Sequence, residues 1–227
     1  NNQNKLSIRL MPGGFCFSTS SNDETPKFVN ITPGADYELR LENAILDLGI
    51  DTAEDDVECH VETARISLSP TDYDEEMAEK MYKLSLRNIE REEKILHETD
   101  RKGETRISFG IDCEFYNFLI RTYQYINFHH PIIGIIDEDA EKIHSSKNWM
   151  TVYVSQGMMS LVAFKEDKLQ VANCTESMVT QNRAYHVLNT WTQLDFDVLN
   201  DTLYIIGNSD EVSKLKKAVS IFIKQCV

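Results

Sequence analysis

Three glycine-containing turns hold the residues best placed for binding chemistry in this sequence. They are Gly13 and Gly14, then Gly157, and then Gly207 followed by Asn208. Turns of this kind present successive backbone N–H groups, which can bind an anion. A metal ion held beside such an anion would also need carboxylate oxygens.

The first two turns contain no acidic residue. The first reads Met11-Pro12-Gly13-Gly14 and the second Ser155-Gln156-Gly157. Pro12 also removes one backbone N–H from the first turn. Neither sequence resembles a Walker motif, so no phosphate loop of that type is predicted.

An acidic run and a histidine pair are the other candidates. Asp137-Glu138-Asp139 would spread over about 200 degrees of a helix, so the three cannot converge on one ion, and we expect a solvated helix face. His129 and His130 precede Pro131 in an extended segment, where neighbouring side chains point to opposite sides, so at most one lines a pocket.

The remaining reactive residue types do not form a recognisable catalytic set. We expect His60, His97, His144 and His186 to be single histidines without partners. No Ser-His-Asp or Cys-His arrangement follows from the spacing, so no catalytic residue is predicted. The five widely spaced cysteines contain no C-x-x-C pair, which indicates reduced core thiols and no metal site.

In the first half of the chain, we expect a β-hairpin to position the turn that contains Gly13 and Gly14. Apolar residues alternate over residues 5–17 around Pro12-Gly13-Gly14, and a third strand is predicted over 27–31. Helical spacing follows up to Gly49, then a strand over 57–68. Asp72 is predicted to start a helix whose apolar residues are Met77, Met81 and Leu84.

The middle of the chain predicts a hairpin, two helices and a strand. Segments 94–97 and 105–111 flank a turn at 100–103, and one helical face carries Phe115, Phe118, Leu119 and Tyr123. A short strand is predicted over 124–128. A helix follows Pro131, because the apolar residues after it recur at helical spacing.

The order of elements then repeats. Adding 144 to the residue number takes Leu6 to Met150, Ile8 to Val152 and Gly13 to Gly157. A third strand over 169–172, a helix over 179–191, a strand over 203–206 and a helix over 212–223 complete the second half. Internal duplication explains this pattern, although hairpins often share alternation and a turn glycine.

Composition limits the partners. The 227 residues include 23 Lys and Arg against 37 Asp and Glu, a net charge of −14 that repels nucleic acid and anionic membrane surfaces. No apolar run reaches the ~18 residues of a membrane helix, and no signal peptide is visible, so we expect a cytoplasmic protein. The absence of an initial Met weakens that expectation.

Three short motifs resemble one known family. They are Ile66-Ser67-Leu68-Ser69-Pro70, the helix start Asp74-Glu75-Glu76, and Phe128-His129-His130-Pro131. These stretches resemble an uncharacterised bacterial family described as having an actin-like ATPase fold. The resemblance implies an α/β protein of two lobes, each a ribonuclease H-like mixed β-sheet with helices. The first lobe would span residues 1–147, with an inserted hairpin and helix, and the second residues 148–227.

The resemblance also implies where a nucleotide would bind. Actin-like ATPases hold phosphates at an Asp-x-Gly hairpin in each half, which corresponds to Gly13, Gly14 and Gly157 here, without the acid. Gly207 and Asn208 resemble an adenosine-binding turn with Asn208 in place of a second glycine. Asn tolerates the left-handed backbone, so that turn can survive. Ser209 or Asp210 could equally cap the helix that follows.

Two classes of function are the main hypotheses. The leading hypothesis is a non-catalytic actin-like scaffold that binds another protein and needs no cofactor. The alternative is a nucleotide-binding ATPase or kinase that uses ATP with magnesium and takes its acids from Asp112 or Asp195. A ribonuclease H-like nuclease is disfavoured by the negative charge. The basic residues Lys214, Lys216, Lys217 and Lys224 indicate a solvated helix face or a docking patch for an acidic segment.

Overall fold

A computed structural model describes residues 5–19, 27–30, 37–48, 56–86, 92–142, 144, 146–155 and 157–227. The chain divides into two compact units. The first contains Asn1–Glu98 and Arg106–Pro131, and the second contains Thr99–Thr105 and Ile132–Val227. The boundary predicted between residues 147 and 148 stays a prediction. No helix in the described ranges is both long enough and apolar enough to cross a membrane.

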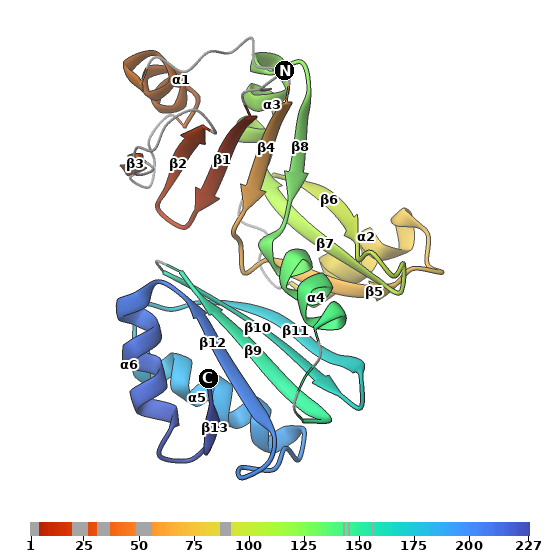
Figure 1. The fold of residues 1–227 in the computed structure, drawn as a ribbon. Helices are drawn as coiled ribbons and strands as arrows, with labels where there is room; N and C mark the ends of the chain where they lie inside the picture. Colours follow the sequence, from red (N-terminus) through yellow and green to blue (C-terminus); the bar gives the residue numbers. More distant parts are fainter. Residues whose placement is uncertain are drawn as a thin grey trace. The chain divides into compact units, whose positions relative to one another are not determined.

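The first unit is built on a five-stranded mixed sheet, whose strands are labelled in Figure 1. Its strands are β1 (Lys5–Met11), β2 (Gly14–Thr19), β3 (Lys27–Asn30), β4 (Asp56–Val61) and β8 (Ile126–His129), in the order β3-β2-β1-β4-β8. β1 pairs antiparallel with β2 and parallel with β4. Alternation in β1 buries Leu6 and Ile8 on one face. Helix α3 (Cys113–Thr122) packs there through Phe115, whose ring lies 6.5 Å from that of Phe15. Helix α1 (Tyr37–Leu48) contacts α3.

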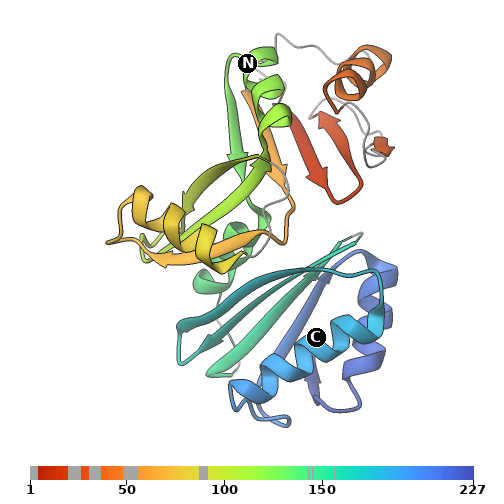
Figure 2. The ribbon, with the colours of Figure 1, turned by 180° about the vertical axis from the view of Figure 1, so that it is seen from behind.

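A second, three-stranded sheet completes this unit. Strands β5 (Ile66–Pro70), β6 (Glu93–Thr99) and β7 (Thr105–Asp112) lie in the order β5-β7-β6. Helix α2 (Glu75–Ser85) covers one of its faces (Figure 2). The turn predicted between β6 and β7 is confirmed, because the Asp100 N–H donates to the Thr105 carbonyl at 3.0 Å.

The single strand predicted over 57–68 is wrong. The segment forms β4 and β5, which belong to different sheets. Apolar residues occupy odd positions up to Val61 and even positions from Ile66, so one continuous strand would have turned its two ends to opposite faces. The predicted helix start at Asp72 is also two residues early, because Asp74 is the N-cap.

The second unit has the same sheet order as the first. Strands β9 (Asn148–Val154), β10 (Met158–Lys165), β11 (Lys168–Glu176), β12 (Thr202–Gly207) and β13 (Gln225–Cys226) lie in the order β11-β10-β9-β12-β13. Helices α5 (Thr180–Gln193) and α6 (Ser209–Val219) contribute Val187, Trp191 and Leu215 to the core over Met150 and Val152. Helix α4 (Pro131–Glu141) precedes this sheet in the chain. The short strand β13 was not predicted.

The two hairpins share one register. Ile8 pairs with Phe17 and Leu10 with Phe15 in the first. Val152 pairs with Leu161 and Val154 with Met159 in the second. These are the positions that an offset of 144 relates, and β12 pairs parallel with β9 as β4 does with β1. Matching register supports duplication, which remains an interpretation of the sequence.

Candidate functional site

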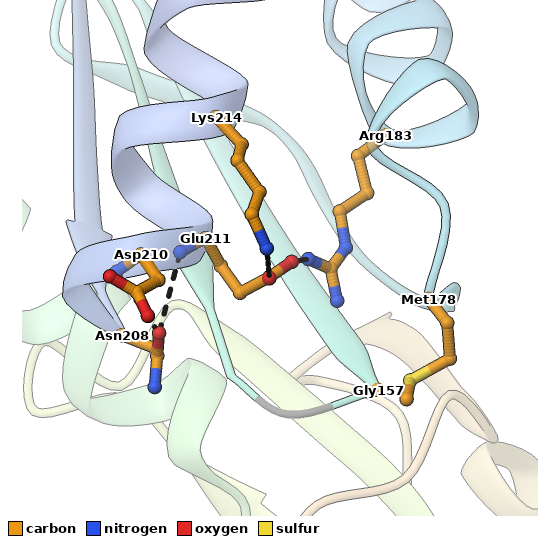
Figure 3. A pocket seen from close by; sticks show the side chains of 7 residues that line it. All are labelled: Gly157, Met178, Arg183, Asn208, Asp210, Glu211 and Lys214. Atoms are coloured by element: carbon orange, nitrogen blue, oxygen red, sulfur yellow. Dashed lines mark hydrogen bonds and ion pairs between the residues drawn. The ribbon is translucent and has the colours of Figure 1, made fainter.

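A pocket of about 300 Å³ lies in the second unit, at the low end of the volumes typical of ligand sites (Figure 3). Three segments form it: the turn after β9, the start of α5 and the start of α6. The lining residues are Gly157, Met178, Arg183, Asn208, Asp210, Glu211 and Lys214. The pocket thus brings together two of the five residues that the sequence predicts to bind a nucleotide, Gly157 and Asn208.

Gly207 fixes the approach of β12 to the end of β9. Its φ is +124°, and a Cβ built there would lie 2.1 Å from the Val154 carbonyl oxygen. The next N–H, that of Asn208, donates to the same oxygen at 2.9 Å. Only glycine permits this contact, because any side chain would collide with the neighbouring strand.

Asn208 caps helix α6. Its side-chain oxygen accepts hydrogen bonds from the N–H groups of Asp210 at 3.2 Å and Glu211 at 3.3 Å. Its φ is −63°, so the left-handed backbone predicted for Asn208 is wrong, and Gly207 carries the positive φ instead. The prediction that Ser209 or Asp210 caps this helix is also wrong, because Asn is itself a preferred N-cap residue.

A buried arginine forms the inner wall of the pocket. The Arg183 side chain is 1% exposed, and its Nη1 donates to Glu211 Oε2 at 2.5 Å. Nη2 donates to the Ser155 carbonyl at 3.2 Å, while Nε has no hydrogen-bond partner. A buried guanidinium is stable only when paired, so Glu211 and the end of β9 hold it in place.

Glu211 is shared between two cations. Lys214 Nζ donates to Oε1 at 2.7 Å, as Figure 3 shows beside the Arg183 bond. The hydrogen bond from Lys214, together with Arg183, lowers the pKa of the Glu211 carboxyl and keeps it ionised. With Asp210 included, two cations and two carboxylates line the pocket, so it carries little net charge.

Sequence reasoning missed both Arg183 and Glu211. A signal for Arg183 was present, because residues 183, 187 and 191 follow one another at four-residue spacing on the buried face of α5. Glu211 stands in the first turn of α6, where an acid is common for reasons of the helix dipole alone. Lys214 was assigned to a solvated face, and its side chain is indeed 59% exposed.

The other predicted residues lie elsewhere. Gly13 and Gly14 belong to the β1–β2 turn of the first unit, where Gly13 has a φ of +83° and open space around it. Asp112 caps α3 by accepting from the N–H groups of Glu114 and Phe115. Asp195 follows α5 with a φ of +54°. Neither Asp112 nor Asp195 lines the pocket.

The solvated face predicted for Asp137-Glu138-Asp139 is wrong for two of its members. Asp137 is 8% exposed and accepts from the Arg101 N–H at 2.8 Å. Asp139 is 1% exposed, its Oδ2 has no hydrogen-bond partner, and burial raises the pKa of its carboxyl. Asp139 lies three residues after Ile136 and seven after Ile132, which places it on the apolar stripe of α4.

Three histidines predicted to be single have partners. His97 Nδ1 lies 2.9 Å from Ser108 Oγ, and the His144 ring stacks on Trp149 at 3.8 Å. The His60 ring lies 5.9 Å from that of His129. These contacts run between strands, or between a strand and its flanking segment, and spacing along the chain does not reveal them.

The side chains of His129 and His130 go to different partners, in agreement with their predicted alternation. His129 Nδ1 lies 2.8 Å from Glu98 Oε1, whereas His130 Nε2 lies 3.0 Å from the Thr63 carbonyl. His130 is buried against Phe109. Among the residues that the structure describes, no three His, Cys, Asp or Glu side chains are grouped closely enough to hold a metal ion.

The residues lining the pocket do not match what a magnesium-bound triphosphate requires. Its two carboxylates belong to α6, and one of them already binds Arg183 and Lys214. The turn at Gly157 follows Ser155 and Gln156 and brings no acid. Arg183, the buried cation of the pocket, already donates to Glu211 and to the Ser155 carbonyl.

A family model described as a protein of unknown function, DUF3822, matches residues 1–226. The chain belongs to this family. A comparison with curated proteins gives no match for the DUF3822 chain.

Solved structures establish the fold of this DUF3822 protein. A Bacteroides thetaiotaomicron protein with actin-like ATPase fold and unknown function is 25% identical, with a TM-score of 0.82 over 99% of this chain and 90% of that one. The PilM-PilN type IV pilus biogenesis complex gives 9% identity and a TM-score of 0.62 over 98% and 88%. The cytoplasmic domain of EpsL, from the Vibrio cholerae type II secretion system, is 10% identical, with a TM-score of 0.51 over 90% of this chain and 82% of that one. The DUF3822 chain therefore has the actin-like ATPase fold, and the resemblance noted in its sequence is confirmed.

Proposed function

We propose that this protein is a non-catalytic actin-like scaffold that binds another protein and has lost the residues that handle phosphate. The observation that supports it is the Arg183–Glu211 pair, which occupies the wall of the pocket that Gly157 and Asn208 line. A guanidinium already bound to a carboxylate offers less to a phosphate, because Glu211 compensates its charge and competes for its N–H donors.

The hairpin turns support the same proposal. Neither Pro12-Gly13-Gly14 nor Ser155-Gln156-Gly157 carries the carboxylate that organises magnesium. Protein binding as the remaining role draws support from a protein of the same fold, PilM, whose structure is that of a complex with PilN. The matching fold alone carries no function, so this support concerns the class of partner only.

One observation favours the alternative, a nucleotide-binding protein. Gly207 keeps the close approach of β12 to β9, and Asn208 opens α6 directly beside the pocket. A helix N-terminus of this kind can attract an anion. The N–H groups of Asp210 and Glu211 already bind Asn208, however, which reduces what the terminus can offer.

Calorimetry with Mg-ATP separates the two functions. We expect no binding tighter than roughly millimolar, about 4 kcal/mol, and no rise in thermal stability with added nucleotide. The matched control is Asn208→Asp, which keeps a good N-cap while adding negative charge to the pocket. A micromolar dissociation constant that this variant abolishes would overturn the scaffold proposal.

A further inference from the structure

The last part of the chain carries positive charge on a protein that is acidic overall. Residues 212–227 contain four lysines and no Asp or Glu, whereas the whole chain has a net charge of −14. Lys214 binds Glu211 in the pocket. The other three are Lys216, Lys217 and Lys224, and none of them forms an ion pair with an acid in the part of the chain that the structure describes.

A turn beside these lysines exposes two large apolar side chains. Val219 and Ile223 are both 0% exposed and anchor the turn in the core, whereas Ile221 is 69% exposed and Phe222 is 55% exposed. The N–H groups of Phe222 and Ile223 donate to the Val219 carbonyl at 2.9 and 3.0 Å. The turn between α6 and β13 therefore holds two apolar side chains in place at the surface (Figure 1).

A neighbouring loop extends this surface. The Lys224 N–H donates to the Val198 carbonyl at 2.8 Å, so the loop before β12 lies beside the turn, and Leu199 in that loop is 58% exposed. Burial raises the pKa of the Cys226 thiol, and Lys216 opposes this effect, which places the Lys216 ammonium near β13. We call the following six residues the C-terminal patch: Leu199, Lys216, Lys217, Ile221, Phe222 and Lys224.

The acids of the neighbouring loop do not cancel the charge of the patch. Asp197 accepts from the Leu199 N–H at 2.8 Å and from Asn200 Nδ2 at 2.6 Å, and these bonds lower the pKa of its carboxyl. Asp201 is 6% exposed and accepts from the Asp197 N–H at 2.7 Å. Three lysines thus stand against one exposed carboxylate in residues 197–201, and the patch keeps a positive charge.

The size and charge of the patch limit what can cover it. Its three apolar side chains expose on the order of 350 Å², which is too little for the ~1,200 Å² of a stable interface between folded chains. A bilayer, a nucleic acid or a second copy of this chain would also extend beyond the patch and meet the acidic remainder of the molecule. A short acidic segment avoids both costs, because it contacts the patch alone and binds transiently.

We propose that the C-terminal patch binds a short acidic segment of another protein. The carboxylates of the segment would meet the three lysines, and an apolar side chain of the segment would pack on Ile221 and Phe222. Because the core already holds these two side chains in place, little ordering of this protein opposes binding. We expect a dissociation constant in the micromolar range, since exposed ion pairs and a small apolar contact each contribute little. This inference rests on the proposed protein-binding function and names the chemistry of the partner.

Selection from a displayed library of short random peptides tests the proposal. It runs in parallel on the full-length wild-type protein and on its Lys216→Gln, Lys224→Gln variant. We expect the wild type to enrich peptides rich in Asp and Glu that also carry an aromatic residue or Leu. In fluorescence anisotropy, the affinity of these peptides should fall about five- to tenfold in the double variant and about tenfold with Phe222→Ser. Binding should also weaken as the salt concentration rises from about 0.1 to about 1 M.

The matched control is Lys80→Gln, Lys83→Gln on α2, where each lysine is paired with a glutamate four residues earlier. It removes the same charge from the chain and should bind the selected peptides as the wild type does. Equal losses in the two double variants would assign the effect to net charge and overturn the proposal, as would equal enrichment on the wild type and the patch variant.

Two further measurements separate the other occupants. Binding to phosphatidylserine vesicles, or self-association in sedimentation, that Lys216→Gln, Lys224→Gln abolishes would assign the patch to a lipid surface or to a second copy and overturn the proposal. We expect neither in the wild type. Calorimetry with Mg-ATP does not involve the C-terminal patch, so this proposal and the scaffold function can fail separately.

Discussion

Gly207 is the residue at which backbone geometry most restricts the sequence. We predict that Gly207→Ala destabilises the protein by about 2 kcal/mol or more, measured as the free energy of unfolding in urea. The new Cβ would lie 2.1 Å from the Val154 oxygen, and the φ of +124° disfavours any side chain. Strand β12 would have to move away from β9.

A matched control lies in the same unit. Gly134 is inside α4, where an added Cβ would meet no atom within 4 Å. Gly134→Ala should therefore be neutral, or stabilising by up to about 1 kcal/mol, because alanine favours a helix. Equal losses for the two glycines would contradict the close approach at Gly207.

We predict that the two members of the Arg183–Glu211 pair contribute unequally to the free energy of unfolding. Glu211→Gln leaves a guanidinium that is 1% exposed without its carboxylate, and we expect a loss of about 2 to 3 kcal/mol. Arg183→Met should cost less, because Glu211 keeps Lys214 at 2.7 Å and is partly exposed. Urea unfolding of both single variants and the double variant measures the coupling. A larger loss for Arg183→Met would count against this assignment.

His130 predicts a pH dependence of stability. Burial lowers the pKa of its imidazole from the ordinary 6.5 to about 4, against a smaller opposing effect of the bond to the Thr63 carbonyl. The unfolded chain therefore takes up the proton first, and stability should fall as the pH drops from about 6.5 to about 4, by at most about 3 kcal/mol.

Urea unfolding across that pH range measures the effect. In His130→Gln this part of the slope should disappear, because the variant has no imidazole to protonate there. His186→Gln, in α5, should keep it. A slope as steep in His130→Gln as in the wild type would assign the effect to another group.

At the level of single residues, sequence reasoning succeeded where the backbone decides and failed where partners decide. Gly157 and Gly207 follow from turn geometry, and both have positive φ. Arg183 and Asp139 were missed because a charged residue on an apolar stripe is normally assumed to face solvent. The burial of Arg183 depends on Glu211, which is 28 residues away in sequence, and the low exposure of Asp139 depends on what packs over α4.

At the scale of elements, the attachment of α2 requires a glycine at position 110, where a side chain would collide with Tyr82. We predict that Gly110→Ala costs about 2 kcal/mol in the free energy of unfolding. A Cβ there would lie 2.2 Å from the Tyr82 hydroxyl and 2.7 Å from Glu93 Oε2. Because Tyr82→Phe removes that hydroxyl, the double variant should recover part of the loss. No recovery would show that Tyr82 is not the obstacle.

Most helices and strands could be predicted because periodicity records which side is buried. The helix after Pro131 and the turn at 100–103 are confirmed for this reason. Periodicity misleads for α2, whose apolar residues Met77 and Leu84 are exposed while Ala78 and Tyr82 are buried. The pattern identifies an amphipathic helix but not which side meets the sheet, since that depends on Gly110 and Glu93.

At the scale of the whole molecule, the cysteines give a simple test. Cys16, Cys59 and Cys174 are buried, Cys113 and Cys226 are half-exposed, and burial raises the pKa of the Cys59 thiol. Thiol titration of the denatured, unreduced protein should find all five sulfhydryls free. In the native protein the two half-exposed thiols should react first. A denatured count clearly below five would indicate a disulfide.

The fold as a whole could be predicted because one hairpin pattern occurs twice. The offset of 144 gave the strand register of the second hairpin from the first, and the structure reproduces it in β9 and β10. The pocket could not be predicted in this way. It depends on Arg183 and Glu211, at positions where the repeat is too weak to align side chains.

Residues 99–105 belong to the second unit, although residues of the first unit flank them on both sides in the sequence. The chain passes between the units at three places, near residues 98, 105 and 131. A segment starting at residue 132 would omit Arg101, whose N–H binds Asp137 and whose guanidinium binds Glu141 at 2.9 Å. The second unit is therefore not contained in one continuous segment of its own, because a cut near residue 131 would leave residues 99–105 attached to the first unit.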